Sequence, residues 1–414
     1  MNKRKIDASI KKDFPFLQNN KETIFLNSSS SSLKLGIVIN KMLEMYSKNE
    51  SLVFRTTSMN TKDNLEILSE TFNVVSNHIN APIEDVILTY GTTYSINRIA
   101  FKLINSLNDG DEIILGKMEH SANILTWKKI AKELNKKIVF KWYNLKNWEI
   151  DYLNLKELIT DKTKIIAVAH VFNTVGTKND LKKIREIIGN KVKLFVDGAQ
   201  AIGHIPINVQ EADVDYYVFG AHKCFGSFGI GFAYIKNLQS IEEPFQYGGG
   251  TDQNYSEDEV IYKTNKFKFL AGTIDLPGAY AFKYAIEYIE SFGMEQIEEY
   301  NNSLKAYAEK KIGSLKKVNI INKNVKSSNL FFEIKGVSGE DVGYHLSKDN
   351  ILLRTGSSCV KITYGDYQPY KAIRASFHIY NNKEDIDKLY ESLKNGGDFL
   401  EALFNKRSPS EICK

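Results

Sequence analysis

Cysteine is scarce in this sequence of 414 residues, which contains only Cys224, Cys359 and Cys413. Three cysteines with no CxxC spacing provide neither an even disulfide framework nor a cysteine zinc knuckle. Such sparing use is typical of a reducing compartment. We therefore expect a cytoplasmic protein without a metal site.

Long hydrophobic runs and one-sided charge are missing as well. No apolar stretch approaches the ~18 residues that a membrane span needs. The basic start, Met1–Lys5, is followed by IDASIKKDF, which lacks the apolar core of a signal peptide. The net charge of +5 is small for this length, and the basic residues are scattered. The sequence therefore predicts neither a membrane nor a nucleic acid as a partner.

What the sequence does contain is a regular alternation of apolar strands with helices. Strands are predicted at Val86–Tyr90, Glu112–Leu115, Ile138–Trp142, Ile165–Ala169, Leu194–Val196 and Tyr216–Phe219. Apolar residues recur at helical spacing between Asp63 and Asn80, and another helix is predicted from Ser95. This alternation indicates an α/β fold whose mostly parallel sheet is flanked by helices on both faces.

The length of the chain predicts two domains, because 414 residues can bury a large core. The large domain is predicted over residues 22–287 and a smaller α/β domain over residues 288–414. The smaller domain has strands near Val318–Ile321 and Asn329–Ile334 and a final helix near Lys383–Leu393. Residues 1–21 are predicted to pack on this smaller domain.

The stretch from Leu194 to Tyr234 places a carboxylate and an amine after two neighbouring strands. Asp197 follows the first strand and Lys223 follows the second. The carboxyl ends of parallel strands form the edge where open α/β folds hold their ligands. Pyridoxal phosphate needs such a pair, because a lysine binds it as a Schiff base and an acid keeps its pyridine nitrogen protonated. Taken singly, the two residues could equally be a surface lysine and a helix-capping carboxylate.

The motifs around these two residues extend the prediction. With VDGAQ at residues 196–200 and GAHK at residues 220–223, the sequence resembles class V, fold-type I aminotransferases over nearly its whole length. Within them it resembles the cysteine desulfurase and selenocysteine lyase branch. The resemblance implies that pyridoxal phosphate is held by Lys223, Asp197, Gln200 at the ring hydroxyl, and His222 at the phosphate.

Two further motifs begin helices. Gly91-Thr92-Thr93 lies between a strand and a helix, where backbone N–H groups suit a phosphate, although an N-cap explains the same residues. The resemblance implies that Thr93 contacts the cofactor phosphate. In EHSAN, His120 could simply cap a helix, but the resemblance implies that it stacks on the cofactor ring and transfers protons. An imidazole suits that role because its pKa is near neutral.

Other family positions imply a substrate contact and a second subunit. The resemblance places Asn173 near the substrate carboxylate and Thr273 at the phosphate of the neighbouring subunit, which implies a homodimer with shared sites. Arg55 is compared with an arginine that enters the partner's site, although its surroundings differ. Ser28–Ser32 is either a wall of the cofactor pocket or a flexible serine loop, and composition leaves both open.

Two side chains, a thiol and a guanidinium, carry the resemblance to the cysteine desulfurase and selenocysteine lyase branch. Cys359 ends RTGSSC on a polar loop, and an accessible thiolate is the nucleophile that desulfuration needs. Arg374 lies in RAS, and its planar fork matches a carboxylate. The separation of the two resembles the short, ordered loop of the group II (SUF-type) enzymes. Cys224 is expected to be packed and inert. Alternatively, Cys359 is a chance loop cysteine and Arg374 pairs with an acidic neighbour.

The chain departs from the branch pattern at three positions. Ser357 and Ser358 stand where histidines are common, which leaves thiolate activation less defined. Gly220 stands where a phosphate-binding serine is found, so that His222 and Thr93 remain as donors.

The resemblance implies a cysteine desulfurase that converts L-cysteine to L-alanine. Sulfur would be retained as a persulfide on Cys359 and passed to an acceptor protein for iron–sulfur cluster or thio-cofactor assembly. One alternative is a selenocysteine lyase, epimerase or other amino-acid lyase on the same scaffold, with L-selenocysteine as a possible substrate. Another is a non-catalytic scaffold that binds pyridoxal phosphate within a sulfur-transfer complex.

Overall fold

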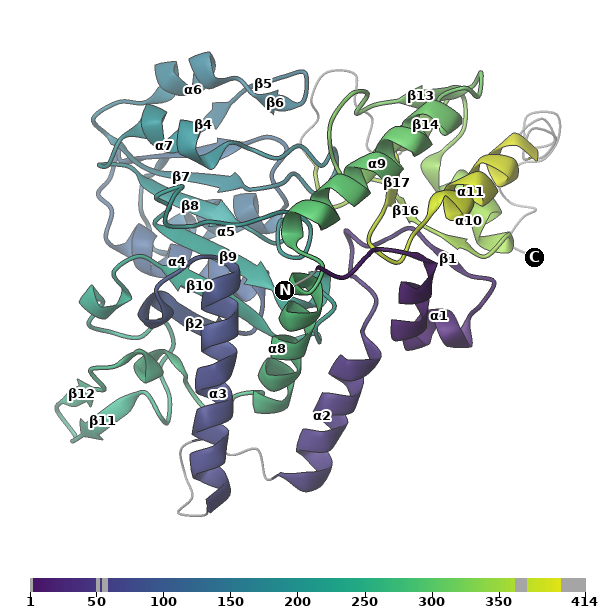
Figure 1. Ribbon diagram of the computed structural model, residues 1–414. Helices are drawn as coiled ribbons and strands as arrows, with labels where there is room; N and C mark the ends of the chain where they lie inside the picture. The colour runs from purple at the N-terminus through teal and green to yellow at the C-terminus, as the bar shows by residue number, and fades with distance from the viewer. Residues whose placement is uncertain (1–2, 50–52, 54–58, 362–370, 396–414) are drawn as a thin grey trace, which may run out of the picture.

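The computed structural model describes residues 3–49, 53, 59–361 and 371–395, and Figure 1 shows their arrangement. A seven-stranded sheet lies at the centre of the larger part, in the order β2-β10-β9-β8-β7-β3-β4. Its strands are β2 (Val86–Thr89), β3 (Glu112–Gly116), β4 (Val139–Tyr143), β7 (Thr163–Ala169), β8 (Lys193–Asp197), β9 (Tyr216–Gly220) and β10 (Gly231–Ile235). Strands β9, β8, β7, β3 and β4 are parallel, while β10 runs antiparallel to β9 and β2. The predicted parallel-dominated sheet is confirmed.

Helices cover both faces of this sheet, as the apolar alternation requires. They are α2 (Gly36–Lys48), α3 (Met59–His78), α4 (Thr92–Asn105), α5 (Ala122–Glu133), α6 (Tyr152–Leu158), α7 (Leu181–Ile188) and α8 (Leu276–Glu290). In β3, Ile113 and Leu115 pack with Trp127 of α5 on one face, whereas Ile114 belongs to the core of the other face, with α3, α7 and α8. Burying each such side chain contributes roughly 1.5–3 kcal/mol. Both faces are therefore hydrophobic cores.

The C-terminal part forms a second, smaller layer around an antiparallel sheet of order β13-β14-β17-β16 (Figure 1). Its elements are α9 (Met294–Ile312), β13 (Val318–Ile320), β14 (Asn329–Ile334), α10 (Gly339–Lys348), β16 (Arg354–Thr355), β17 (Ile373–Ser376) and α11 (Lys383–Asn395). A separate core that includes Leu330, Phe332 and Leu389 holds it together. Beside it, β1 (Ile24–Phe25) pairs in parallel with β15 (Ile351–Leu352). The predicted division at residue 288 stays a prediction.

The N-terminal segment, with α1 (Pro15–Asn19), contacts both parts of the chain. The ring of Phe14 lies 5.2 Å from that of Phe225 and 4.8 Å from that of Tyr380, and Phe14 belongs to the core of the large sheet. The ammonium of Lys11 donates to Asp385 Oδ1 of α11 at 2.7 Å. The first residues therefore join the two parts.

Outside the large sheet lie two small hairpins, β5 (Leu145–Lys146) with β6 (Glu149–Ile150) and β11 (Asp252–Tyr255) with β12 (Val260–Tyr262). Figure 1 shows the second hairpin projecting from the body of the protein. No helix within the described ranges has the length and apolarity that crossing a membrane requires.

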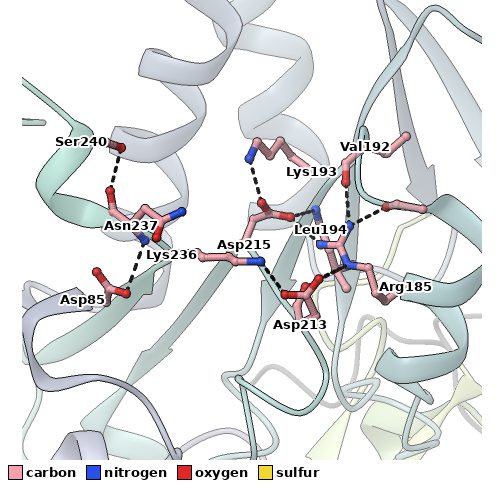
Figure 2. Close-up of polar contacts among 11 residues, drawn as sticks. Asp85, Arg185, Val192, Lys193, Leu194, Asp213, Asp215, Lys236, Asn237 and Ser240 are labelled. Carbon is pink, nitrogen blue, oxygen red and sulfur yellow. Dashed lines mark hydrogen bonds and ion pairs between the residues drawn. The ribbon is translucent and has the colours of Figure 1, made fainter.

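A network of ion pairs and hydrogen bonds lies at the amino ends of β8 and β9 (Figure 2). The carboxylate of Asp215 accepts hydrogen bonds from Arg185 Nη2, from Lys193 Nζ at 2.8 Å and from Leu194 N at 2.9 Å. Arg185 is 9% exposed and also donates to three backbone carbonyls, one of them of Asp213. Buried charges are tolerated when they are paired in this way. The opposite edge of the sheet, where the parallel strands end, holds the cavity described next.

Candidate active site

A cavity of about 440 Å³ opens at the carboxyl ends of the parallel strands. The predicted site residues that line it are Thr93, His120, Asn173, Asp197, Gln200, His222, Lys223, Cys359 and Arg374. They come from α4 and β17, from the turn after β3, from the carboxyl ends of β7, β8 and β9, and from the loop after β16. Residues more than 250 positions apart are thus brought to one place.

Lys223 and Asp197 occupy neighbouring strand ends in this cavity. Lys223 ends a 3₁₀ turn, Ala221–Lys223, that directly follows β9. Burial lowers the pKa of Lys223 to about 8, so a substantial fraction of the amine is neutral near neutral pH. A neutral amine is the form that attacks a carbonyl. Asp197 is 5% exposed, and its Oδ1 accepts a hydrogen bond from Ala199 N at 2.9 Å.

The serine tract holds the turn that carries Lys223. The carbonyl of His222 accepts hydrogen bonds from Ser32 N and from Lys34 Nζ, both at 3.0 Å. Ser32 Oγ in turn accepts from Phe225 N at 2.7 Å. Ser29 and Ser30 line the cavity, and Ser29 O accepts from the side-chain amide of Gln200 at 2.8 Å. Of the two interpretations that composition left open, these contacts favour a wall of the cavity.

The start of α4 forms the polar end of the cavity. Gly91 precedes the helix with a φ of +119°, which a glycine adopts without the strain of a side chain. The first N–H groups of a helix lack intrahelical partners and attract anions. Thr92 Oγ1 is buried here without a hydrogen-bond partner among the described residues. A Cβ added at Gly220 would lie 3.1 Å from His222 Nδ1 and 3.3 Å from Thr92 Oγ1, so the glycine leaves room between two donors.

His120 reaches the cavity from the turn between β3 and α5. Its Nδ1 accepts a hydrogen bond from Ala122 N at 3.2 Å, which places the proton of the neutral ring on Nε2. Burial lowers the pKa of His120, and the positive charge of Lys223 lowers it further. The ring is therefore neutral at physiological pH.

The loop that carries Cys359 has a constrained backbone. Gly356, Ser358 and Cys359 have φ values of +77°, +48° and +64°, and the two non-glycine residues each cost roughly 1 kcal/mol in this region. Hydrogen bonds from the larger part offset that cost. Ser121 N and Oγ donate to Cys359 O at 3.0 and 2.6 Å, and Asn173 Nδ2 donates to Ser358 O at 2.6 Å. These bonds hold the backbone of Ser358 and Cys359, and the exposed Cys359 lines the cavity.

Arg374 crosses from β17 to the same cavity. It is 2% exposed, and its Nη1 donates to Asn173 O at 2.5 Å while its Nη2 donates to Ser30 Oγ at 2.8 Å. Both acceptors belong to the large part of the chain. These two bonds fix the orientation of the planar guanidinium at the cavity wall.

Some predicted residues do not join this cluster. Thr273 is exposed on the loop before α8 and does not line the cavity. Arg55 and Cys413 lie outside the described residues. Cys224 is fully buried and burial raises the pKa of its thiol, in agreement with the expected inert packing.

The cavity wall also contains residues that the sequence motifs did not single out. Tyr90, Phe228 and Arg354 line it, and Phe228 is 68% exposed. Each lies within or near a motif already described: Tyr90 precedes Gly91-Thr92-Thr93, Phe228 follows GAHK by five residues, and Arg354 begins RTGSSC. Adjacency to these motifs was the available signal.

The donors around the cavity fit pyridoxal phosphate. A partly neutral lysine, a buried carboxylate and a helix start with further donors are the groups that bind its aldehyde, ring nitrogen and phosphate. The thiol of Cys359 and the guanidinium of Arg374 are additional and face the same space. They provide a nucleophile and a carboxylate-binding cation.

Comparison with known proteins agrees with this arrangement. Residues 24–389 match the family described as aminotransferase class-V. A probable cysteine desulfurase of Ureaplasma parvum is 37% identical over 402 residues, covering 95% of this chain and 99% of the relative. A cysteine desulfurase of Wigglesworthia glossinidia brevipalpis is 32% identical over 94% of this chain and 97% of its own.

Solved structures resemble the whole chain as well. The cysteine desulfurase of Thermococcus onnurineus superposes with a TM-score of 0.88 at 26% identity, covering 95% of this chain and 99% of that one. A cysteine desulfurase of Escherichia coli gives a TM-score of 0.84 at 28% identity, over 95% of this chain and 98% of its own. By its family match and its full-length relatives, the chain belongs to the class-V aminotransferase family, in which it is similar to the cysteine desulfurases.

Proposed function

We propose that this chain is a pyridoxal-phosphate-dependent cysteine desulfurase that converts L-cysteine to L-alanine. The observation that carries the proposal is the joint presence of Cys359 and Arg374 in the cavity that contains Lys223 and Asp197. The similarity to proteins named cysteine desulfurases along nearly the whole chain supports it.

In this proposal each side chain has one role. Lys223 binds the cofactor, Asp197 and Gln200 hold its ring, and Thr93 and His222 hold its phosphate. When bound, pyridoxal phosphate supplies an electron sink that weakens bonds at the substrate carbon. Arg374 and Asn173 hold the substrate carboxylate, while His120 and Lys223 take up and return protons.

Cys359 performs the sulfur step. Its thiolate attacks the sulfur of bound cysteine, so that a sulfur–sulfur bond forms as the carbon–sulfur bond breaks. The electron pair of the broken bond stays with the carbon skeleton, which takes up protons and leaves as alanine. Cys359 keeps the sulfur as a persulfide, which passes to an acceptor protein for iron–sulfur cluster or thio-cofactor assembly. We propose a cytoplasmic location, since Cys359 must remain a reduced thiol.

A second subunit belongs to the proposal. Thr273 is exposed and lies outside the cavity of its own chain. An exposed threonine on the AGT loop is available to a neighbouring copy, where it would complete the phosphate site. We therefore propose a homodimer with shared sites.

The test is alanine formation by the purified protein with pyridoxal phosphate, L-cysteine and a reductant. Cys359→Ala should lower the rate by orders of magnitude while cofactor binding persists. The matched control is Cys224→Ala, which removes a buried thiol that does not line the cavity. Normal alanine formation by Cys359→Ala would favour a lyase that does not use the thiol, and no alanine from the unmodified protein would favour a scaffold.

A further inference from the structure

Glu119 is a buried carboxylate to which the proposed function gives no role. It lies in the turn after β3, directly before His120, and has no exposed surface. The hydroxyl of Tyr143 and the backbone N–H of Ala169 donate to its Oε1 at 2.6 and 2.9 Å. The side-chain amide of Asn123 donates to its Oε2 at 2.8 Å. Glu119 thus joins the ends of β7 and β4, the two strands that flank β3.

The direction of these hydrogen bonds is fixed by chemistry. The indole of Trp127 can only donate, and it donates to Asn123 Oδ1 at 3.1 Å, so the amide nitrogen of Asn123 faces Glu119. Burial and the charge of Glu119 raise the pKa of Tyr143 far above its usual value, which keeps the phenol protonated. Each of these contacts therefore offers a hydrogen to Glu119, which favours the ionised carboxylate over the protonated one.

The hydrogen bond between Tyr143 and Glu119 depends on a glycine. A Cβ at Gly116, the last residue of β3, would lie 2.1 Å from the hydroxyl oxygen of Tyr143. The phenol therefore passes over a position that tolerates no side chain before it reaches Glu119. The carboxylate of Glu119 is therefore held by a set of residues that includes Gly116, Tyr143, Asn123 and Trp127.

The carboxylate lies directly behind the floor of the cavity. Ala169, whose N–H binds Glu119, lines the cavity and pairs with Asp197 across β7 and β8. The two carboxylates are close enough that the charge of Asp197 raises the pKa of Glu119, although burial is the larger cause and the three donors oppose both. The result is a pKa of about 7, which a nearby cation would lower.

We propose that Glu119 is a positioning residue, a second anion that acts with Asp197 to place negative charge next to the cavity that would hold the cofactor. This proposal rests on the proposed function, because only a bound cofactor supplies the positive charge that Glu119 and Asp197 would face. The same hydrogen bonds hold the ends of β7, β3 and β4 together, so that His120 and Asp197 keep their spacing.

A second substitution tests whether the charge of Glu119 is needed. In Glu119→Gln the new amide nitrogen would face the amide nitrogen of Asn123, two donors without an acceptor. Adding Asn123→Asp restores an acceptor there, while Trp127 still donates to residue 123. The double variant therefore keeps the hydrogen bonds and the net charge, and it moves the charge by only a few ångström, because Asn123 Nδ2 lies 2.8 Å from Glu119 Oε2.

The holoenzymes are compared by the pH midpoint of the visible absorption of the lysine-bound cofactor and by melting temperature. A unit charge roughly 10 Å away in a medium of effective dielectric constant about 20 shifts a pKa by about one unit. Nearby anions stabilise the protonated, positively charged form of the lysine-bound cofactor. Its pH midpoint should therefore fall by about one unit in Glu119→Gln. In the double variant the charge returns to within a few ångström of its original place, so the melting temperature and most of the midpoint should recover.

An unchanged midpoint in Glu119→Gln would overturn the proposal, and so would a double variant whose melting temperature recovers while its midpoint stays low. If the double variant does not fold, Tyr143→Phe decides: one donor fewer weakens the ionised form, so the midpoint should fall by a smaller amount, and an unchanged midpoint refutes the inference. The unmodified protein is measured first. If it gains no Lys223-dependent absorption with pyridoxal phosphate, the proposed function fails before Glu119 is tested.

Discussion

Replacing Arg374 by lysine tests how the cavity recognises its substrate. Arginine places two terminal nitrogens on Asn173 O and Ser30 Oγ, at 2.5 and 2.8 Å. A lysine has one nitrogen on a flexible stem, so it cannot satisfy both acceptors and also grip a carboxylate with two parallel bonds. Losing one charge-assisted bond to the substrate costs roughly 1.5–3 kcal/mol. That corresponds to a dissociation constant for cysteine about ten to a hundred times higher.

Binding is best measured in a Cys359→Ala background, because substrate then binds without turnover. Cysteine is titrated against the cofactor absorption, and the melting temperature is recorded for the same samples. Arg185→Lys is the matched control. Arg185 is also buried and hydrogen-bonded (Figure 2), but it does not line the cavity, so its replacement should lower stability and leave cysteine affinity unchanged.

The two variants should therefore differ in affinity while resembling each other in stability. A destabilised Arg374→Lys that binds cysteine normally would mean that the arginine only connects the two parts of the chain. The assignment of the substrate carboxylate to Arg374 would then be wrong.

Three further predictions concern acid stability, the phosphate end and assembly. Burial lowers the pKa of His204 to about 4, below the value near 6.5 of an unfolded histidine. The unfolded state therefore binds the proton more readily, so stability is complete above pH 6.5 and decreases toward pH 4, by up to about 3 kcal/mol from this residue. His204→Asn should flatten the dependence of the urea midpoint on pH, and an unchanged slope would contradict this. Gly220→Ser should bind pyridoxal phosphate about fivefold more tightly than Gly220→Ala. Both variants add a Cβ at this close contact, but only serine adds a hydroxyl donor, worth about 1 kcal/mol. Equal affinities in a fluorescence titration would argue against a phosphate there. Light scattering should give the mass of a dimer, and Thr273→Ala should weaken cofactor binding in it; a stable, fully active monomer would exclude a shared site.

The position of the site could be predicted from the sequence because topology fixes it. Asp197 and Lys223 each follow an apolar run, and parallel strands bring their carboxyl ends to one edge whatever their order. The sheet order itself could not be predicted. Strand β10 lies between β9 and β2 and runs against both, and nothing in its apolar sequence distinguishes it from a parallel strand.

Local boundaries and distant contacts were harder to predict. The helix expected from Ser95 begins at Thr92, because Gly91 adopts a positive φ and ends the preceding strand earlier than apolar spacing indicates. The hydrogen bond from Lys34 Nζ to His222 O and the burial of Glu119 depend on partners from other elements. Such contacts follow from three-dimensional packing, which no local pattern contains.

The pinned backbone of the Cys359 loop limits how sulfur can leave. Asn173 and Ser121 anchor the carbonyls of two successive residues, Ser358 and Cys359, to the larger part of the protein. A persulfide on this loop could travel only as far as its own side chain rotates, unless these bonds break. In the proposed reaction an acceptor would therefore have to approach the sulfur where Cys359 is exposed, at the cavity that Phe228 and Tyr90 also line.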